Sequence, residues 1–195
     1  MYLYGASGHA KVIIDILENN RIPIDGLYDD HSELTELCGY PVSRPVVLNS
    51  PLIISIGDNK IRKRLSETLP VDFGTAIDPS AIISHRSEYG MGTVMMQGVI
   101  VQSHVHIGEH CIINSGSSID HDCTIGNYVH ISPHTTLCGN ISVGEGSWIG
   151  AGTTVIPGVS IGRWCVIGAG SVVTKDIPDY SLAVGNRCKI VKTLK

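Results

Sequence analysis

From Ile77 to Val173 the chain places an apolar residue at every sixth position without a break, with Tyr89 among them. The residues four places further on, such as Thr93 and Cys111, are nearly all small or β-branched. Two phases that stay in step over about a hundred residues predict a solenoid of short parallel strands, with one large and one small side chain of each hexad inside. A β-sandwich would need irregular loops between its strands, and the unbroken phase leaves none.

Residues 1–75 lack this period. We expect a strand over 1–4, a tight turn at Gly5–His9 and a helix that ends near residue 20. A second strand is expected over 24–28 and a third over 51–56, followed by a helix over 59–67 that Asp58 caps. This order predicts a small open α/β unit. The chain therefore divides into an α/β domain (1–75), a parallel β-helix (76–178) and a C-terminal tail (179–195).

Composition narrows the function classes. The 195 residues carry 14 Lys and Arg against 18 Asp and Glu, a net charge of −4, which offers no footprint for nucleic acid. With 43% hydrophobic and 16% charged residues, the chain is not disordered. Its 22 glycines and 5% aromatic residues fit a repetitive core.

The cysteines and the N-terminus bear on location. None of the six cysteines forms a CxxC pair, and the first residues lack the basic leader and cleavage site of a signal peptide. No apolar run approaches the ~18 residues that span a bilayer. We therefore expect reduced thiols, a cytoplasmic location and no membrane partner.

Histidines are the main candidates for chemistry. Seven of the nine lie in the repeat, all outside the two inward phases: His85, His104, His106, His110, His121, His130 and His134. We expect all seven to project outward into solvent. Because hexads stack three apart, His121 should lie beneath Gly139, beside the carboxylate of Asp122. Such a pair suits a general base, and the glycine N–H suits an oxyanion, although a solvated surface histidine fits the spacing equally well.

Four stretches carry a family resemblance: YGASGHAKV, LYDD, SIGDNKIRKRL and INSGSSIDHDCTIGNYVHISPHTTLCGNISVG. Over nearly its whole length the chain resembles the bacterial hexapeptide-repeat sugar acyltransferases, which include sialic acid O-acetyltransferases and N-acetyltransferases of UDP-4-amino sugars. The resemblance implies a mainly β fold, namely a left-handed parallel β-helix after a Rossmann-like βαβαβ domain. It also implies acetyl-CoA as co-substrate and a homotrimer with sites at its interfaces.

The resemblance also implies residue roles. His121 matches the general base, Asp122 stands where the family usually has Glu, and Asn114 matches an asparagine near the acceptor. His130 matches a histidine near the acetyl thioester, while the coenzyme A groove is matched by Gly139, Ala151 and Ala169. In the tail, Arg187 and Lys189 could meet coenzyme phosphates, although VGNRCK departs from the family's proline and alanine. Nucleotide-sugar contacts are matched by Gly5, Ser7, Gly8, His9, Asp29, Asp30, Asp58 and Asn59.

These roles predict an acetyl-CoA-dependent N-acetyltransferase of a nucleotide-linked (UDP-) amino sugar, with direct attack assisted by His121. An O-acetyltransferase of sialic acid or another sugar hydroxyl would use the same base. A metal-dependent hydratase would need three protein ligands; His85 and His121 share a column, but no third imidazole joins them, so no metal is expected. A binding or scaffold module that has lost catalysis stays open, because a fold does not determine a function.

Overall fold

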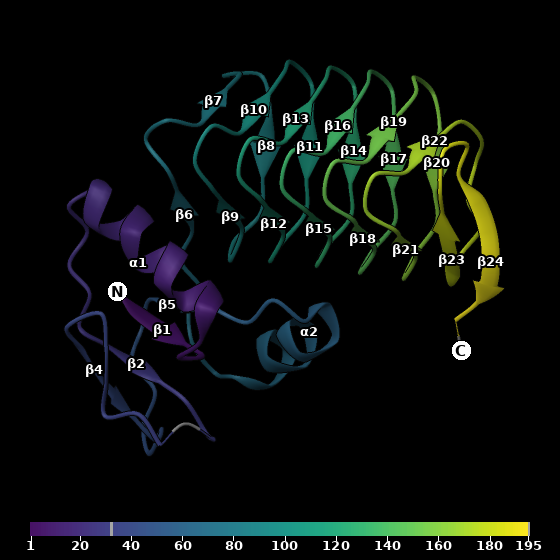
Figure 1. Cartoon of the computed structure of the whole chain (residues 1–195). Coiled ribbons are helices and arrows are strands. Elements are labelled where there is room, and N and C mark those ends of the chain that lie inside the picture. Colours follow the sequence, from purple (N-terminus) through teal and green to yellow (C-terminus); the bar gives the residue numbers. More distant parts are fainter. Residues whose placement is uncertain (32, 195) are drawn as a thin grey trace.

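The computed structural model describes residues 1–31 and 33–194 and consists of a β-solenoid with an α/β unit packed against one side (Figure 1). The elements of the α/β unit are β1 (Tyr2–Tyr4), α1 (Gly8–Asn19), β2 (Gly26–Tyr28), β3 (Glu36–Leu37), β4 (Tyr40–Ser43), β5 (Leu52–Ile54) and α2 (Asn59–Thr68). The five strands form a sheet in the order β3-β4-β2-β1-β5, and all neighbouring strands are parallel except in the β3–β4 hairpin. The expected strands and helices are present, and the hairpin is an addition that sequence reasoning missed.

The solenoid repeats a two-residue strand every six residues. Its strands are β6 (Ala76–Ile77), β7 (Ile82–Ile83), β8 (Glu88–Tyr89), β9 (Val94–Met95), β10 (Ile100–Val101), β11 (His106–Ile107), β12 (Ile112–Ile113), β13 (Ser118–Ile119), β14 (Thr124–Ile125), β15 (His130–Ile131), β16 (Thr136–Leu137), β17 (Ser142–Val143), β18 (Trp148–Ile149), β19 (Thr154–Val155), β20 (Ser160–Ile161), β21 (Val166–Ile167) and β22 (Val172–Val173). Each strand from β6 to β19 pairs in parallel with the strand eighteen residues on, as Ile100 does with Ser118. Three sheets result, of six, five and eight strands, and the eight-stranded sheet includes two further strands near the C-terminal end of the chain.

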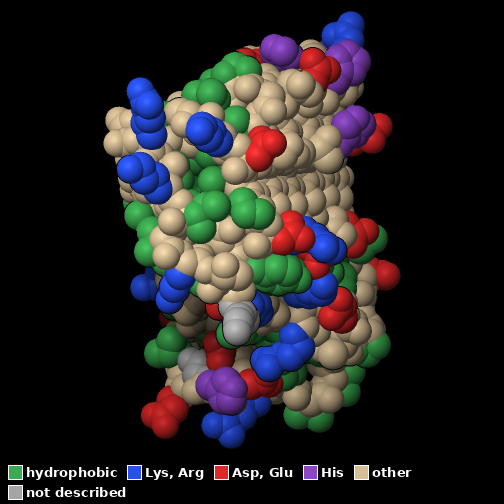
Figure 2. All heavy atoms as spheres, turned by 90° about the vertical axis from the view of Figure 1, so that its right-hand side faces the viewer, with side chains coloured by type: hydrophobic (Ala, Val, Ile, Leu, Met, Phe, Trp, Pro, Cys, Tyr) green, Lys and Arg blue, Asp and Glu red, His purple; other side chains and the backbone are tan. Residues whose placement is uncertain are grey.

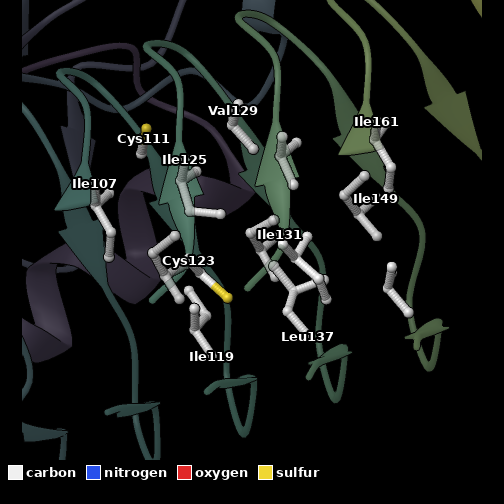
Figure 3. Close-up of a cluster of buried hydrophobic side chains, with 14 of the residues drawn as sticks. Ile107, Cys111, Ile119, Cys123, Ile125, Val129, Ile131, Leu137, Ile149 and Ile161 are labelled. Carbon is white, nitrogen blue, oxygen red and sulfur yellow. The ribbon is translucent and has the colours of Figure 1, made fainter. Parts of the chain in front are cut away.

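The inside of the solenoid is filled as the two phases predict. One continuous core joins the large aliphatic residues of one phase to the small residues of the other, among them Cys111 and Cys123, and Figure 3 shows these side chains projecting from successive coils into the interior. Tyr89 is an exception, with 43% of its surface exposed. It lies on β8, the edge strand of its sheet, so no earlier coil covers it.

Helix α1 covers the first coils of the eight-stranded sheet. Its buried face, which includes Ile13 and Leu17, shares one core with the outward side chains of Ala76, Val94 and Ile112. Burial of such aliphatic side chains contributes about 1.5–3 kcal/mol each. The α/β unit is therefore fixed to one side of the prism by an apolar contact.

Helix α2 is fixed to the same sheet by polar contacts. Arg62, fully buried, donates from Nε to the carbonyl of His110 at 2.7 Å and from Nη2 to that of Tyr128 at 3.0 Å. Asn59 donates to the Gly146 carbonyl at 3.1 Å. These three carbonyls lie at the same corner of successive coils, eighteen residues apart. Because this contact covers the corner, His110 is buried rather than solvated as predicted, in contact with Phe73 and Tyr128.

The chain ends in a hairpin of β23 (Ser181–Val184) and β24 (Lys189–Thr193), which extends the eight-stranded sheet. Of the predicted tail, Lys195 lies outside the described residues. The helices formed by the described residues are all too short or too polar to cross a bilayer.

Candidate functional site

His121 and Asp122 form a hydrogen-bonded pair at the corner between the six-stranded sheet and the five-stranded sheet of the solenoid. Nδ1 of His121 lies 2.7 Å from Oδ2 of Asp122, and both side chains are exposed. A carboxylate only accepts hydrogen bonds, so in the neutral ring Nδ1 carries the proton and Nε2 keeps its lone pair. The pair therefore presents a proton acceptor to solvent.

Gly139 lies one coil further along, directly over the His121 ring. A Cβ placed on Gly139 would lie 2.6 Å from Cε1 and 2.7 Å from Nε2 of His121, so only glycine leaves room for this ring. Among the described residues the Gly139 N–H has no hydrogen-bond acceptor. A free backbone donor beside a proton acceptor is the arrangement that an oxyanion intermediate requires.

Two carboxylates make His121 more basic. The pKa of His121 is raised, chiefly by the hydrogen bond to Asp122 and then by the charge of Asp120. Asp120 also fixes the local backbone, because its Oδ1 accepts the N–H of His121 at 2.8 Å. The exposed ring thus has the properties of a base that acts near neutral pH.

We predict that Asp122→Asn moves the acid limb of the pH dependence of kcat/KM to lower pH. A base works only when deprotonated, so activity falls as the pH drops through the pKa of His121, and loss of the carboxylate lowers that pKa. The measurement is kcat/KM against pH for the wild type and the variant. An acid limb that stays in place would show that another group limits the rate at low pH.

A second polar group lies on the outer face of the eight-stranded sheet. Nδ2 of Asn114 lies 3.2 Å from Nε2 of His130, and the His130 ring stacks on Trp148 with centroids 5.5 Å apart. Burial and the positive charges of Arg62 and His9 lower the pKa of His130 to about 3. His130 is therefore neutral and largely covered, in contrast to the predicted solvated ring.

The hydrogen bonds also determine the tautomer of His130. Oδ1 of Asn114 accepts the N–H of Ser115 at 2.9 Å, so the Asn114 amide directs its NH₂ group at His130. Nε2 of His130 then accepts, and Nδ1 carries the proton. This Nδ1 is buried and has no hydrogen-bond partner among the described residues. A buried donor without an acceptor costs about 1–3 kcal/mol.

The two groups lie on opposite sides of the prism. His121 and Asp122 occupy the corner between β13 and β14, which belong to the six- and five-stranded sheets. His130 lies on β15 of the eight-stranded sheet, and Asn114 follows β12 of the same sheet. In a triangular prism a corner faces away from the third side. One chain alone therefore does not bring His121 together with Asn114 and His130.

The turn after β1 carries the first four residues predicted for the nucleotide sugar. Gly5 has φ +110°, and a Cβ there would lie 2.7 Å from Cγ1 of Ile56. Gly8, at the start of α1, has open space around its Cα. Ser7 is the N-cap of α1 but makes no side-chain cap bond. His9 is half-buried near His130, and burial lowers its pKa to about 4.

The predicted aspartates at the end of β2 are engaged within the chain. Oδ2 of Asp29 accepts the Ala6 N–H at 2.8 Å, and Oδ1 accepts the His31 N–H at 2.9 Å, so Asp29 shapes the turn after β1. Oδ2 of Asp30 accepts the Tyr4 hydroxyl at 2.7 Å, and burial together with this bond raises the pKa of Tyr4 to about 12. A ribose or base contact of either residue stays a prediction.

The other two predicted nucleotide contacts begin α2. Oδ1 of Asp58 accepts the Ile61 N–H at 2.8 Å and caps the helix as expected. Asn59, in contrast, is buried and uses both ends of its amide, Nδ2 toward the Gly146 carbonyl and Oδ1 toward Arg62. Its side chain holds the two parts of the chain together, and a nucleotide contact of Asn59 stays a prediction.

The residues predicted to line a coenzyme A groove are spread over the later coils. Ala151 and Ala169 are exposed and lie one above the other at the corner between the eight- and six-stranded sheets. Arg187 and Lys189 are exposed in the terminal hairpin. A groove that joins these positions to Gly139 needs a second surface, since Gly139 lies at another corner.

The structure adds residues that sequence reasoning missed. Trp148 covers His130 and donates from Nε1 to Oγ of Ser132 at 2.8 Å. The sequence feature that could have identified Trp148 is its large aromatic side chain at an outward position of the hexad, where a polar residue is usual. Among the described residues no cluster of three His, Cys, Asp or Glu side chains could hold a metal ion. His85 and His121 are two coils apart, roughly 10 Å at the spacing of paired strands, too far to share one.

Both parts of the chain match family models. Residues 1–69 match the PglD N-terminal domain, and residues 104–139 and 140–175 match the bacterial transferase hexapeptide (six repeats).

Solved structures of similar sequence cover nearly the whole chain. A perosamine N-acetyltransferase from Caulobacter crescentus, solved with CoA and GDP-perosamine, is 36% identical with a TM-score of 0.95, over 98% of this chain and 96% of that one. The acetyltransferase domain of PglB from Neisseria gonorrhoeae, solved with acetyl coenzyme A, is 30% identical with a TM-score of 0.91, over 97% and 98%. These likenesses confirm the predicted left-handed β-helix after a small α/β unit.

Among curated proteins, a UDP-N-acetylbacillosamine N-acetyltransferase from Bacillus subtilis is 38% identical over 107 residues, which is 48% of this chain and 50% of the relative. The matched part spans half or less of the length of the curated relatives.

Proposed function

Because the chain belongs to the hexapeptide-repeat sugar acyltransferase family, we propose that it transfers an acetyl group from acetyl-CoA to the amino group of a nucleotide-linked amino sugar. The observation that carries the proposal is the His121–Asp122 pair beneath the free N–H of Gly139. Similar proteins of nearly full coverage are named as N-acetyltransferases of such sugars or are solved with acetyl coenzyme A, which supports this acceptor and this donor.

The chemistry follows from the atoms present. The sugar amine attacks the thioester carbonyl, and Nε2 of His121 takes the proton that the nitrogen must lose as the C–N bond forms. The carbonyl oxygen becomes an oxyanion, to which the Gly139 N–H donates. When the C–S bond breaks, the proton on Nε2 passes to the thiolate of coenzyme A. No covalent acyl-enzyme is needed, because both substrates meet in one groove.

We further infer that two copies of the chain build each site. His121 and Asp122 would come from one copy and Asn114 and His130 from its neighbour, since the two pairs lie on opposite sides of one prism. A cyclic homotrimer with three such sites fits this arrangement, because each copy presents both surfaces.

The test is an acetyl-transfer screen that follows release of free thiol from acetyl-CoA. The panel contains UDP-, GDP- and dTDP-linked amino sugars, with a sialic acid as the hydroxyl acceptor. We expect saturable transfer to one or more nucleotide amino sugars and none to the same sugars without the nucleotide. Transfer to the sialic acid alone would overturn the proposed acceptor and favour O-acetylation.

A further inference from the structure

The peptide unit between Cys138 and Gly139 is held differently from its neighbours. The N–H of Cys138 donates to the Val155 carbonyl, and the Gly139 carbonyl accepts the N–H of Gly158, both at 3.1 Å. These two bonds join the turn to the next coil. The Cys138 carbonyl and the Gly139 N–H lie between them and take part in no backbone–backbone hydrogen bond among the described residues. The ladder between coils therefore leaves the orientation of this peptide unit open.

A buried thiol supplies the missing contact. Cys123 directly follows Asp122 and is fully buried, and Figure 3 shows its side chain inside the solenoid. Its Sγ donates to the Cys138 carbonyl at 3.1 Å and lies 3.7 Å from the carbonyl oxygen of His121. Burial raises the pKa of the Cys123 thiol, so the thiol keeps its proton and remains a donor. One side chain thus contacts both the residue of the base and the residue before Gly139.

This contact determines where the Gly139 N–H points. The C=O and the N–H of a trans peptide point in opposite directions. Because the Cys138 carbonyl points inward at Cys123, the Gly139 N–H points outward, at the corner where the ring of His121 lies. Glycine adopts a wide range of φ values, so without the thiol this peptide can turn over at little cost. The N–H would then point away from the corner.

The next coil leaves this N–H free for a ligand atom. In another coil the equivalent N–H, that of Glu109, is accepted by Oδ1 of Asn127 at 2.9 Å. The residue eighteen positions after Gly139 is Pro157, whose side chain has no acceptor. Histidine and acidic side chains gather on the side of the solenoid away from the α/β unit (Figure 2). The Gly139 corner faces that side, because the α/β unit covers the eight-stranded sheet opposite.

We propose that Cys123 is a positioning residue for acetyl transfer, which holds the Gly139 N–H in the direction of the oxyanion. The inference rests on the proposed function, in which that N–H donates to the thioester carbonyl oxygen. Ser117, Ser147 and Cys165 occupy the same inward position in other hexads, and each donates to the carbonyl of a later corner, at 3.0, 2.7 and 3.1 Å. The bond of Cys123 differs in its place, because it ends at the peptide whose N–H lies over the base.

Two variants of Cys123 separate positioning from packing. Cys123→Ala removes the donor and should lower kcat by about tenfold or more with KM nearly unchanged, since loss of an oxyanion donor costs about 10²–10³ in kcat and here the donor is displaced. Cys123→Ser keeps a hydroxyl donor, and Ser117 and Ser147 show that this position of the hexad accommodates serine. It should restore kcat close to the wild-type value. The assay is thiol release with the acceptor found in the screen.

Cys165→Ala is the matched control. The Cys165 thiol makes contacts of the same lengths, 3.1 Å and 3.7 Å, to two carbonyls more than two coils beyond His121. Its loss should lower Tm about as much as Cys123→Ala does, because both remove one buried donor. It should leave kcat close to that of the wild type. An effect of Cys123→Ala that came from stability alone would appear equally in the control.

A crystal structure of the full-length Cys123→Ala protein tests the geometry without any acetyl transfer. We expect the peptide between residues 138 and 139 to be turned, so that the Gly139 N–H no longer points out of the corner. A peptide that keeps its orientation would overturn the inference. A wild type that acetylates no member of the panel would refute the proposed function. An active wild type with equal kcat for the Cys123→Ala and Cys165→Ala proteins would refute the role of Cys123 alone.

Discussion

His121→Ala is expected to lower kcat for acetyl transfer by about 10²–10⁴-fold, the range that a positioned general base contributes. The substitution removes Nε2 of His121, which lies at the corner beneath Gly139. Apart from this atom, the described side chains at that corner offer only carboxylates as proton acceptors, and carboxylates have a much lower proton affinity. KM should change little, because the ring is needed chiefly after both substrates are bound. The measurement is thiol release under saturating conditions with the acceptor found in the screen.

His85→Ala is the matched control. His85 is an exposed histidine in the same column, two coils away, so its loss should leave kcat within a few-fold of the wild type. The proposed chemistry fails if His121→Ala keeps kcat within about tenfold of the wild type, less than a general base supplies.

Mixing variants tests the shared site. His121→Ala and His130→Ala proteins, each weakly active alone, should regain about a quarter of wild-type activity when they are co-expressed in equal amounts. In random trimers, about a quarter of the interfaces then join a copy that keeps His121 to a neighbour that keeps His130. No recovery in assembled mixed oligomers would place both groups in the site of a single copy.

Arg62→Met should lower the free energy of unfolding by about 3–5 kcal/mol. Arg62 is fully buried and donates to the carbonyls of His110 and Tyr128, which accept no other hydrogen bond among the described residues. Its loss leaves both carbonyls buried without a donor, at about 1–3 kcal/mol each, and also frees Asn59. A thermal melt followed by circular dichroism should show Tm lowered by roughly 10 °C for a chain of this size.

Arg64→Met provides the comparison, because it makes the same change two residues further on in α2 at an exposed position. Its effect on unfolding should stay within about 0.5 kcal/mol. Equal melting of the two variant proteins would show that the corner carbonyls do not hold α2 in place.

The solenoid could be predicted because its burial pattern is local. In each hexad the same two positions face the core, so the period alone identifies inward residues such as Ile131 and Cys123. The hairpin at residues 36–43 was missed because β3 has two residues and β4 contains Pro41, a residue that argues against a strand. The burial of His110 could not be predicted either, since α2 covers it from nearly fifty positions away in the sequence.

The candidate site was predictable in part for the same reason. The eighteen-residue register places Gly139 over His121, and the structure agrees. The environment of His130 depends instead on Trp148, on Asn114 and on the nearby α/β unit. An outward position in the hexad shows only that a side chain points away from the core of the solenoid. Whether that side chain is solvated or packed against the α/β unit depends on tertiary contacts, which the period of the sequence does not reveal.

The corner carbonyls held by α2 also limit how the solenoid can grow. Arg62 and Asn59 together bind three successive coils, which lie about 4.8 Å apart. The hydrogen-bond donors at the start of α2 therefore match the spacing of the coils. An insertion between His110 and Gly146 that is not a whole eighteen-residue coil would turn the later corner away from α2 and leave one donor without its acceptor. The same insertion after Val173 would leave every one of these bonds intact, so such changes in length should be tolerated best near the C-terminal end of the solenoid.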